Sequence, residues 1–263
     1  MSDPSRPPES RIFAVANQKG GVGKTTTAIN LGAALAASGQ KVLIIDIDPQ
    51  GNASTGLGID LGARQTTTYD LLMAGAPLPD AVQPTKVANL SIVPATTDLS
   101  SADIDLVANE RRIYLLQAAL RTPAGQSYDY VLIDCPPSLN LLTVNAFVAA
   151  DAVIVPLQSE FFALEGLSQL MLTIRDVRER ANPGLRIEGI ALTMHDARNN
   201  LARQVEEDAR ENLGDLVFET VIPRNVRLSE APSYAMPVLD YDPTSRGAQA
   251  YRALAAELLA RNA

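Results

Sequence analysis

The sequence predicts an α/β protein, a single domain in which a twisted, mostly parallel sheet carries helices on both faces. Strand-like and helix-like segments alternate along most of the 263 residues, which is typical of a parallel sheet with helical crossovers. A glycine-rich loop also follows the first apolar strand and precedes a helix-like segment. That context is typical of the phosphate-binding loop of P-loop NTPases.

Composition excludes several classes of protein. The net charge of −8 means that any contact with nucleic acid must come from a local basic patch. The single cysteine, Cys135, excludes an intramolecular disulfide and argues against a multi-cysteine zinc site. Residues 1–10 are polar and lack the apolar segment of a secretory signal, and no apolar run approaches a membrane span. We therefore expect a cytoplasmic protein with a disordered lead-in over 1–10 and one domain over 11–263.

The first half of the chain carries three expected strands. Residues 42–45 are uninterruptedly apolar, as in a parallel strand buried on both faces. The helix after the glycine loop is expected to end at Gly39, a left-handed cap, and 98–120 is periodic and expected to be helical. The expected strands are 11–17, 42–45 and 90–94, with a helical fragment at 69–73 inside an otherwise loop-like stretch over 51–85.

The second half continues the alternation. The apolar run that ends at Asp134 predicts another buried strand. The last helix places Ala248, Tyr251 and Leu254 on one apolar face. The expected strands are 128–134, 152–156, 186–193 and 216–222, and the expected helices are 160–180, 197–213 and 244–261.

The glycine loop, Asn17–Thr26, has the residue types that hold a triphosphate. Its glycines let backbone N–H groups turn toward an anion without Cβ clashes, and the following helix points its N-terminus at the same place. Lys24 can reach the β- and γ-phosphates, and the Thr25 hydroxyl can ligate Mg²⁺. The strict G-x-x-x-x-G-K-[ST] pattern is not met, because Gln18 stands at its first glycine and Lys19 follows it.

Three aspartates, Asp46, Asp48 and Asp134, end two of the expected strands, at the edge where open α/β sheets bind ligands. Asp134 fits the Walker B role of holding Mg²⁺ through its water shell. A strand that continued to Asp48 would put Asp46 and Asp48 on one face, one serving the metal and the other orienting water. Alternatively, one or both cap the next turn, since Asp-Pro is common turn chemistry.

Two further side chains are predicted to have no catalytic role. Cys135 follows the Walker B aspartate and is expected to pack as a small buried hydrophobe. His195, the only histidine, has no partner at the spacing of a catalytic or metal-binding pair.

Read together, five segments resemble the chromosomal ParA/Soj partition ATPases, which carry a deviant Walker A motif. The resemblance covers nearly the whole chain beyond residue 10. It implies an ATP-dependent sandwich homodimer with Mg²⁺, non-specific binding of double-stranded DNA on the nucleoid, and a weak ATPase that a ParB/Spo0J-type partner stimulates, with no membrane contact. The segments are 17–27, 42–58, 129–138, 193–200 and 221–232.

The resemblance also implies residue roles. Lys19 matches the signature lysine, which reaches the partner's nucleotide and offsets charge there as an arginine finger does. The implied catalytic residues are Lys19, Lys24 and Asp48, and the implied metal ligands are Thr25, Asp48 and Asp134. The implied ATP contacts are Lys19, Gly20, Gly21, Val22, Gly23, Lys24, Thr25 and Thr26, with Pro223, Arg224 and Asn225 at the adenine.

Arg198 and Arg227 match the family's arginines for non-specific DNA binding. Charge pattern alone favours another interpretation, because Glu206, Glu207 and nearby acids share that region and indicate a solvated mixed-charge face. Fixed cations are nevertheless what phosphate neutralisation requires.

Three other classes of protein have related loops and fit the sequence less well. A MinD-like membrane-cycling ATPase uses a basic amphipathic C-terminal helix, whereas the tail over 255–263 is short and has one cation. An electron-transfer ATPase like the nitrogenase iron protein needs two cysteines per subunit. A ligase such as a biotin-pathway synthetase is disfavoured by Lys19 and by residues 221–232.

Overall fold

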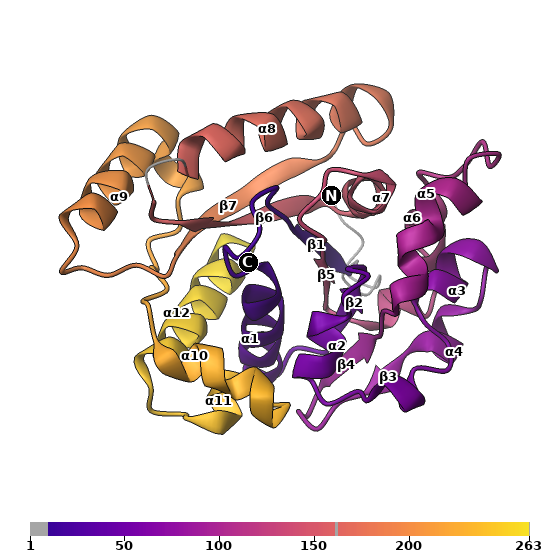
Figure 1. Ribbon diagram of the computed structural model, residues 1–263, viewed down its shortest axis with the longest axis horizontal. Helices are drawn as coiled ribbons and strands as arrows, with labels where there is room; N and C mark the ends of the chain where they lie inside the picture. Colours follow the sequence, from indigo (N-terminus) through magenta and orange to yellow (C-terminus); the bar gives the residue numbers. More distant parts are fainter. Residues whose placement is uncertain (1–9, 161–162, 263) are drawn as a thin grey trace, which may run out of the picture.

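The computed structural model describes residues 10–160 and 163–262, and its centre is a seven-stranded sheet in the order β3-β4-β2-β5-β1-β6-β7 (Figure 1). All neighbouring strands are parallel except β3, which runs antiparallel to β4. The predicted mostly parallel sheet is therefore confirmed. The strands are β1 Arg11–Val15, β2 Val42–Asp46, β3 Gln83–Pro84, β4 Leu90–Val93, β5 Tyr130–Asp134, β6 Ala152–Gln158 and β7 Arg186–Thr193.

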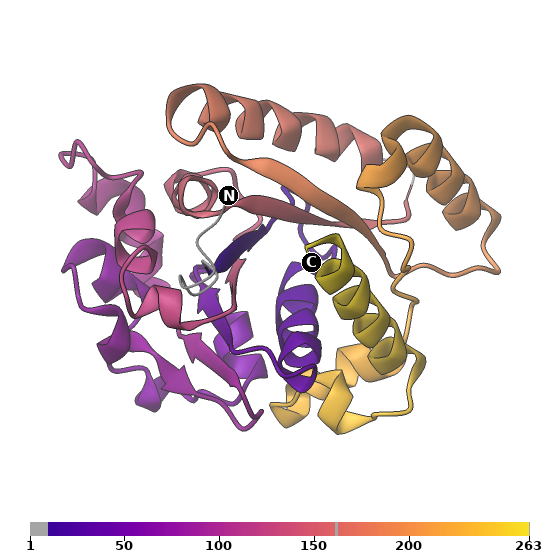
Figure 2. The same cartoon turned by 180° about the vertical axis from the view of Figure 1, so that it is seen from behind.

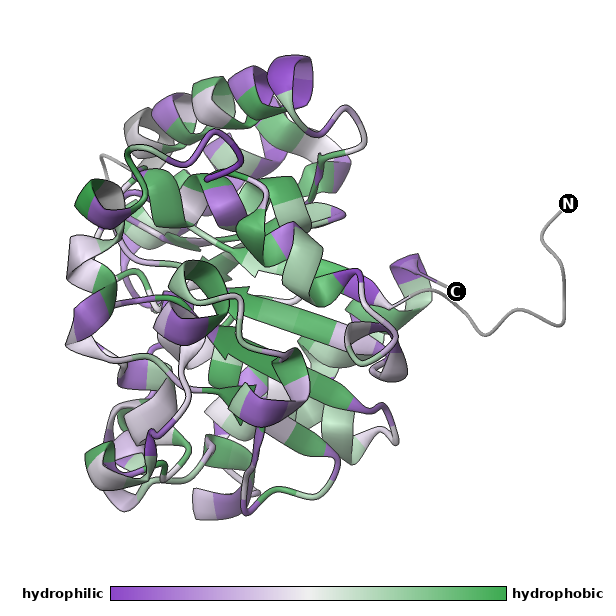
Figure 3. Cartoon of the chain, turned by 90° about the vertical axis from the view of Figure 1, so that its right-hand side faces the viewer, coloured by the Kyte–Doolittle hydropathy of each residue, from purple (hydrophilic) through white to green (hydrophobic). Residues whose placement is uncertain are grey.

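Each face of the sheet has its own apolar core, because successive side chains of a strand point to opposite faces. Ile12 and Ala14 of β1 pack into one core, and Phe13 packs into the other. The apolar strands run through the middle of the molecule, with polar residues on the outer faces of the helices (Figure 3). This two-sided burial explains why the central strands read as continuous apolar runs.

The helices divide between the two cores. One core is covered by α3 (Thr68–Met73), α6 (Leu115–Leu120), α7 (Leu141–Ala149), α8 (Ala163–Arg180) and α9 (Asn200–Leu213). The other is covered by α1 (Lys24–Ala37), α2 (Asn52–Gly56), α10 (Val226–Glu230), α11 (Val238–Tyr241) and α12 (Arg246–Arg261). Helices α1 and α12 lie side by side in both views (Figures 1 and 2), which brings Tyr251 of α12 beside Thr27 in the first turns of α1.

The single helix expected over 98–120 is wrong. The structure has a 3₁₀ turn (Thr97–Ser101), α5 (Ala102–Asp105) and α6, separated by turns. The Asn109 carboxamide oxygen accepts from the Arg111 N–H, and the Arg112 guanidinium donates to the carbonyl of Val107. Such local side-chain bonds compete with the helical ladder.

The strand expected over 216–222 is also wrong. A 3₁₀ turn covers Gly214–Leu216, and Val217 makes only an isolated bridge to Ile190. The N–H groups of Glu219 and Thr220 donate instead to the Glu257 carboxylate of α12. These two N–H groups therefore do not take part in a strand ladder, although the N–H groups of Phe218 and Ile222 still donate to the carbonyls of Ile190 and Leu192 in β7.

Several smaller differences complete the comparison. The stretch over 51–85 holds α2 and α4 (Leu78–Ala81) besides the expected fragment at α3. Helix α9 begins at Asn200, because the Asn199 side chain accepts from the Leu201 N–H as its cap. The expected lead-in lies outside the described residues except for Ser10, and so do residues 161–162 near the start of α8.

Candidate nucleotide-binding site

The glycine loop joins β1 to α1 at the carboxyl edge of the sheet. Gly21 and Gly23 have φ of 75° and 88°, the left-handed region that favours glycine. Gly23 caps α1 without a side-chain hydrogen bond, so the first-turn N–H groups face the loop without a side-chain acceptor. The loop lines a pocket of about 340 Å³, whose lining residues are Gly20, Gly21, Gly23, Lys24, Thr25, Thr26, Asp48, Gln50, Asn52, Pro137 and Met194.

Lys24 is buried inside this loop. Its ammonium donates to the backbone oxygen of Lys19 at 3.0 Å. Burial lowers the pKa of Lys24, while Asp134, Cys135 and Asp48 act to raise it. The cation is thus held where an anion entering the pocket would meet it.

The ends of β6 and β7 hold the loop in place. The Thr193 hydroxyl donates to the carbonyl of Val22 at 2.9 Å. The Asn17 amide donates to the carbonyl of Pro156 at 2.7 Å, and its oxygen accepts from the Lys19 N–H at 3.0 Å. Because strands of the sheet core provide these contacts, the cradle is formed before any ligand arrives.

Asp46 is an anchor for the chain that follows β2. Its buried carboxylate accepts from the Ser54 N–H (2.8 Å), the Ser54 hydroxyl (2.6 Å) and the Asp48 N–H (3.2 Å). Burial raises the pKa of Asp46 to about 6. Since β2 ends at Asp46, strand alternation does not extend to Asp48. The two carboxylates therefore have different tasks.

Asp48 lies at the phosphate pocket. One of its carboxylate oxygens accepts from the Gln50 N–H at 3.0 Å, which is the turn chemistry expected of Asp-Pro. The same side chain lines the pocket that the loop forms. A turn cap and a pocket residue are therefore combined in one side chain.

Asp134 ends β5 directly opposite Asp46 in the sheet register and is fully buried. Neither of its carboxylate oxygens has a hydrogen-bond partner. Burial raises the pKa of Asp134 well above its usual range, and Asp46 adds to this, whereas Thr25 and Lys24 oppose it. A buried carboxylate without a partner is a costly group that a cation would stabilise.

These residues fit Mg²⁺. Among the described residues no three His, Cys, Asp or Glu side chains converge as a protein-only metal cage requires. Mg²⁺ does not need such a cage, because it keeps several waters and binds through one or two carboxylates and ligand phosphates. The Thr25 hydroxyl, Asp48 and Asp134 are oxygen donors of this kind.

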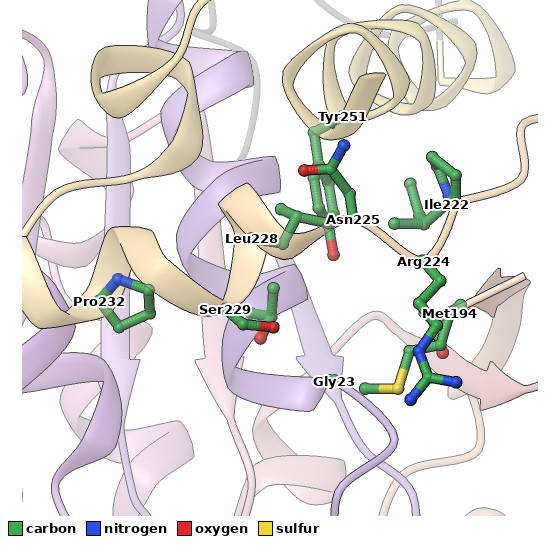
Figure 4. Close-up of a pocket in the computed structure, with 12 residues that line it drawn as sticks. Gly23, Met194, Ile222, Arg224, Asn225, Leu228, Ser229, Pro232 and Tyr251 are labelled. Carbon is green, nitrogen blue, oxygen red and sulfur yellow. The ribbon is translucent and has the colours of Figure 1, made fainter. Parts of the chain in front are cut away.

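A second pocket has a volume of about 330 Å³ (Figure 4). Pro223, Arg224 and Asn225, which the resemblance assigns to the adenine, line this pocket. Both pockets are lined by Gly23, Thr26 and Met194, so they adjoin, and we call the two together the trough. The remaining lining residues are Thr193, Ile222, Leu228, Ser229, Pro232 and Tyr251.

Sequence reasoning did not predict several lining residues of this trough, among them Thr193, Met194 and Tyr251. Thr193 and Met194 lie in a segment noted for its resemblance, but only Arg198 was chosen from it. Tyr251 was expected to lie on the apolar face of the last helix, and it does so, yet its hydroxyl also lies 3.1 Å from the hydroxyl of Thr27. Its place at the pocket depends on the packing of α12 against α1, which no local pattern shows.

Lys19 lines neither pocket of its own chain. Its ammonium forms an ion pair with Glu160 at 2.7 Å, and the two side chains are 40% and 50% exposed. The lysine is thus at the surface beside the loop rather than in the cradle.

The two arginines chosen for DNA binding are exposed and paired. Arg198 is 91% exposed and holds Asp196 by two bonds of 3.0 and 2.9 Å, which lowers the pKa of Asp196 to about 2. Arg227 pairs with Glu230 at 2.8 Å and with Asp242 at 3.2 Å. In the part of the chain that the structure describes, no helix is both long and apolar enough to cross a bilayer.

Comparison with known proteins supplies relatives over nearly the full length. A family sequence model described as "AAA domain" matches residues 10–187. Chromosome partitioning protein ParA of Caulobacter vibrioides (strain NA1000 / CB15N) is 60% identical over 252 residues, 95% of this chain and 94% of that protein. Sporulation initiation inhibitor protein Soj of Bacillus subtilis (strain 168) is 53% identical over 250 residues, 95% and 98% of the two chains.

Solved structures share the fold. A Mycobacterium smegmatis protein described as cobyrinic acid a,c-diamide synthase, with bound ATP analogue and magnesium, has a TM-score of 0.85 and 38% identity, covering 95% of this chain and 94% of that one. The septum site-determining protein MinD of Pyrococcus horikoshii OT3, complexed with Mg-ADP, has a TM-score of 0.78 and 29% identity, covering 95% and 96%.

Proposed function

Because this chain belongs to the ParA/Soj family of chromosome-partitioning ATPases, we propose that it partitions DNA as an ATP-driven switch. ATP closes a homodimer, the dimer holds nucleoid DNA without sequence preference, and hydrolysis stimulated by a ParB-type centromere-binding partner releases it. The observation that carries the proposal is this trough, in which a phosphate cradle shares lining residues with a base-sized pocket. Beside the cradle residues Lys24 and Thr25, the buried Asp134 carboxylate has no hydrogen-bond partner.

ATP and Mg²⁺ are the cofactors that suit this trough. Gly20, Gly21, Val22, Gly23, Lys24 and Thr26 would hold the phosphates, and all of them except Val22 line the phosphate pocket. Pro223–Asn225 would hold the adenine. Thr25, Asp48 and Asp134 would hold Mg²⁺, which neutralises phosphate charge when bound. The proteins of similar structure are described with an ATP analogue and magnesium or with Mg-ADP.

Dimerisation would complete the site. Lys19 stands outside its own cradle, so in a face-to-face dimer its ammonium can reach the partner's phosphates and offset charge that develops there. Asp48, at the pocket edge, would orient the attacking water. Hydrolysis should be slow in isolation, because the Asp48 carboxylate already accepts the Gln50 N–H and is no strong base.

DNA would bind to the exposed arginines. Arg198 and Arg227 are held by carboxylates on their own chain, and DNA phosphates would take over these bonds. Such contacts are independent of sequence and sensitive to salt. A dimer presents each arginine twice, and two linked weak sites bind far more tightly than one.

The rival classes receive less support. The relative described as a cobyrinic acid synthase is 38% identical, whereas a partitioning protein is 60% identical over the same share of this chain. A MinD-like lipid helix would have to come from α12, but its apolar residues Leu254 and Leu258 are fully buried in the core. Lipid binding would therefore require α12 to leave the fold.

Retention of the protein on a non-specific DNA duplex tests the proposal directly. Binding is measured with Mg-ATP, with Mg-ADP and without nucleotide, and liposomes of anionic lipid serve as a parallel surface. We expect retention on DNA with Mg-ATP alone and none on liposomes. Equal retention in all three nucleotide states would contradict the switch, and ATP-dependent retention on liposomes would favour the membrane-cycling class.

A further inference from the structure

Met194 lies at the junction of the two pockets and lines both of them. Its side chain extends toward Gly23 (Figure 4), and its methyl group lies 4.0 Å from where a Cβ on Gly23 would stand. Although large and apolar, Met194 is 37% exposed. The thioether therefore presents apolar surface to the trough where phosphate cradle and base pocket meet.

The backbone of Met194 is held in a conformation that is unfavourable for its side chain. Its φ is +52°, in the left-handed region that residues with a long side chain seldom adopt. Both neighbours are fixed, since Thr193 bonds to Val22, and His195 exchanges backbone bonds with Ile222 (3.1 Å) and Arg224 (2.9 Å). Such strain persists only where the surrounding structure imposes it, and it concentrates at functional sites.

The strained residue has a geometric consequence. In an extended strand, successive side chains point to opposite faces. The left-handed turn at Met194 breaks that alternation, and Thr193 and Met194 both line the base pocket. Without the left-handed conformation of Met194, its thioether would point away from the trough.

We propose that Met194 is a nucleoside-binding residue, whose thioether packs against the sugar and base edge of a bound purine nucleotide and aligns them with the phosphate loop. The inference rests on the proposed function, because it takes the trough to hold a nucleotide. A polarizable thioether with three rotatable bonds makes favourable contacts with aromatic rings. Its exposed apolar surface would be removed from water only when the nucleoside is in place.

A purely structural role makes a different prediction. If Met194 only supported the loop at Gly23, its loss would weaken the binding of every phosphate ligand. Inorganic tripolyphosphate separates the two roles, because it can occupy the cradle but has no sugar or base.

The experiment is a calorimetric titration of the full chain with Mg-ADP and with Mg-tripolyphosphate. The variants are Met194→Ala, Met194→Leu as the conservative replacement, and Leu172→Ala, a comparably exposed apolar residue of α8, as a distant control. We expect Met194→Ala to weaken ADP by roughly 5- to 20-fold while tripolyphosphate stays within about twofold. The ADP affinity of Met194→Leu should stay within about threefold of the parent, and Leu172→Ala should change the affinity for neither ligand.

Two results would overturn the inference alone. One is an unchanged ADP affinity in Met194→Ala, and the other is an equal loss of ADP and tripolyphosphate, which would assign Met194 to support of the loop. A parent protein that binds neither ligand would instead overturn the proposed function, and this inference with it.

Discussion

The ammonium of Lys19 and the carboxylate of Glu160 form an ion pair beside the phosphate loop, with Nζ and Oε2 2.7 Å apart. Both side chains are about half exposed, so the pair contributes only about 0–1 kcal/mol. A triphosphate carries more negative charge than one carboxylate, so it can displace Glu160 from the Lys19 ammonium. The ion pair therefore restrains Lys19, which the proposed dimer needs, but breaking the pair requires little free energy.

Glu160→Gln removes the carboxylate that competes for Lys19. We expect the Mg-ATP dimer to form at about two- to fivefold lower protein concentration, since up to about 1 kcal/mol of restraint is lost. Sedimentation velocity with a non-hydrolysable ATP analogue measures this. Glu179→Gln, which removes an exposed ion pair of α8 with Arg175, is the matched control and should change nothing. A weaker dimer in Glu160→Gln would show that Glu160 aids association rather than opposing it.

Asp48→Ala should abolish hydrolysis while ATP binding stays intact, because Asp48 borders the pocket without supporting the glycine loop. The ATP dimer should then remain on DNA longer than the parent dimer. Phosphate release and dissociation from DNA measure the two effects. Asp46→Asn is a useful comparison, since Asp46 faces Ser54 and should affect stability more than turnover. Parental turnover by Asp48→Ala would refute the role given to Asp48.

Asp134→Asn should stabilise the folded protein without metal and reduce its stabilisation by Mg-ADP. Burial raises the pKa of Asp134 in the folded protein. A carboxyl group whose pKa is raised on folding destabilises the folded state at every pH above its pKa in the unfolded chain, and neutral pH lies in that range. In EDTA the variant should be more stable than the parent by about 1–3 kcal/mol. Mg-ADP should raise the melting temperature of the parent much more than that of the variant. Equal Mg-ADP stabilisation of both proteins would remove Asp134 from the metal site.

Local patterns predicted the features that depend on local causes. The glycine loop and the buried strands appear as continuous sequence signals, because left-handed glycines and two-sided burial act residue by residue. The carboxylates were harder to separate, since Asp46 and Asp48 look alike until Ser54 folds back onto the first of them. The segment 216–222 looked like a strand, but the N–H groups of Glu219 and Thr220 in its middle bond to Glu257, far along the chain.

The base pocket shows the same limit. Met194 reaches the trough through one left-handed residue, and Tyr251 reaches it through the packing of α12 on α1. Neither a positive φ at one residue nor a contact between residues more than 200 positions apart produces a periodic pattern in the sequence. The resemblance predicted Pro223–Asn225 at this pocket, whereas only the structure identifies Met194 and Tyr251 as lining residues.

Arg227→Glu should abolish ATP-dependent retention on DNA and leave dimerisation unchanged. Arg227 is half exposed and pairs only with Glu230 and Asp242 among the charged side chains that the structure describes, so the fold should tolerate its reversal, since exposed ion pairs contribute little to stability. Each phosphate contact that is lost should reduce the slope of log K against log salt by about one unit. DNA retention at several salt concentrations, with sedimentation for the dimer, measures both effects.

The control must carry the same charge change away from the proposed surface. Arg175→Glu on α8 meets this need, since Arg175 is exposed and its pair with Glu179 is loose, at 3.9 Å. General repulsion between a more acidic protein and DNA would weaken both variants alike, because it depends on net charge. Loss of a specific phosphate contact would weaken Arg227→Glu alone and lower its salt slope. Equal retention by Arg227→Glu and the parent at every salt concentration would place the DNA surface elsewhere.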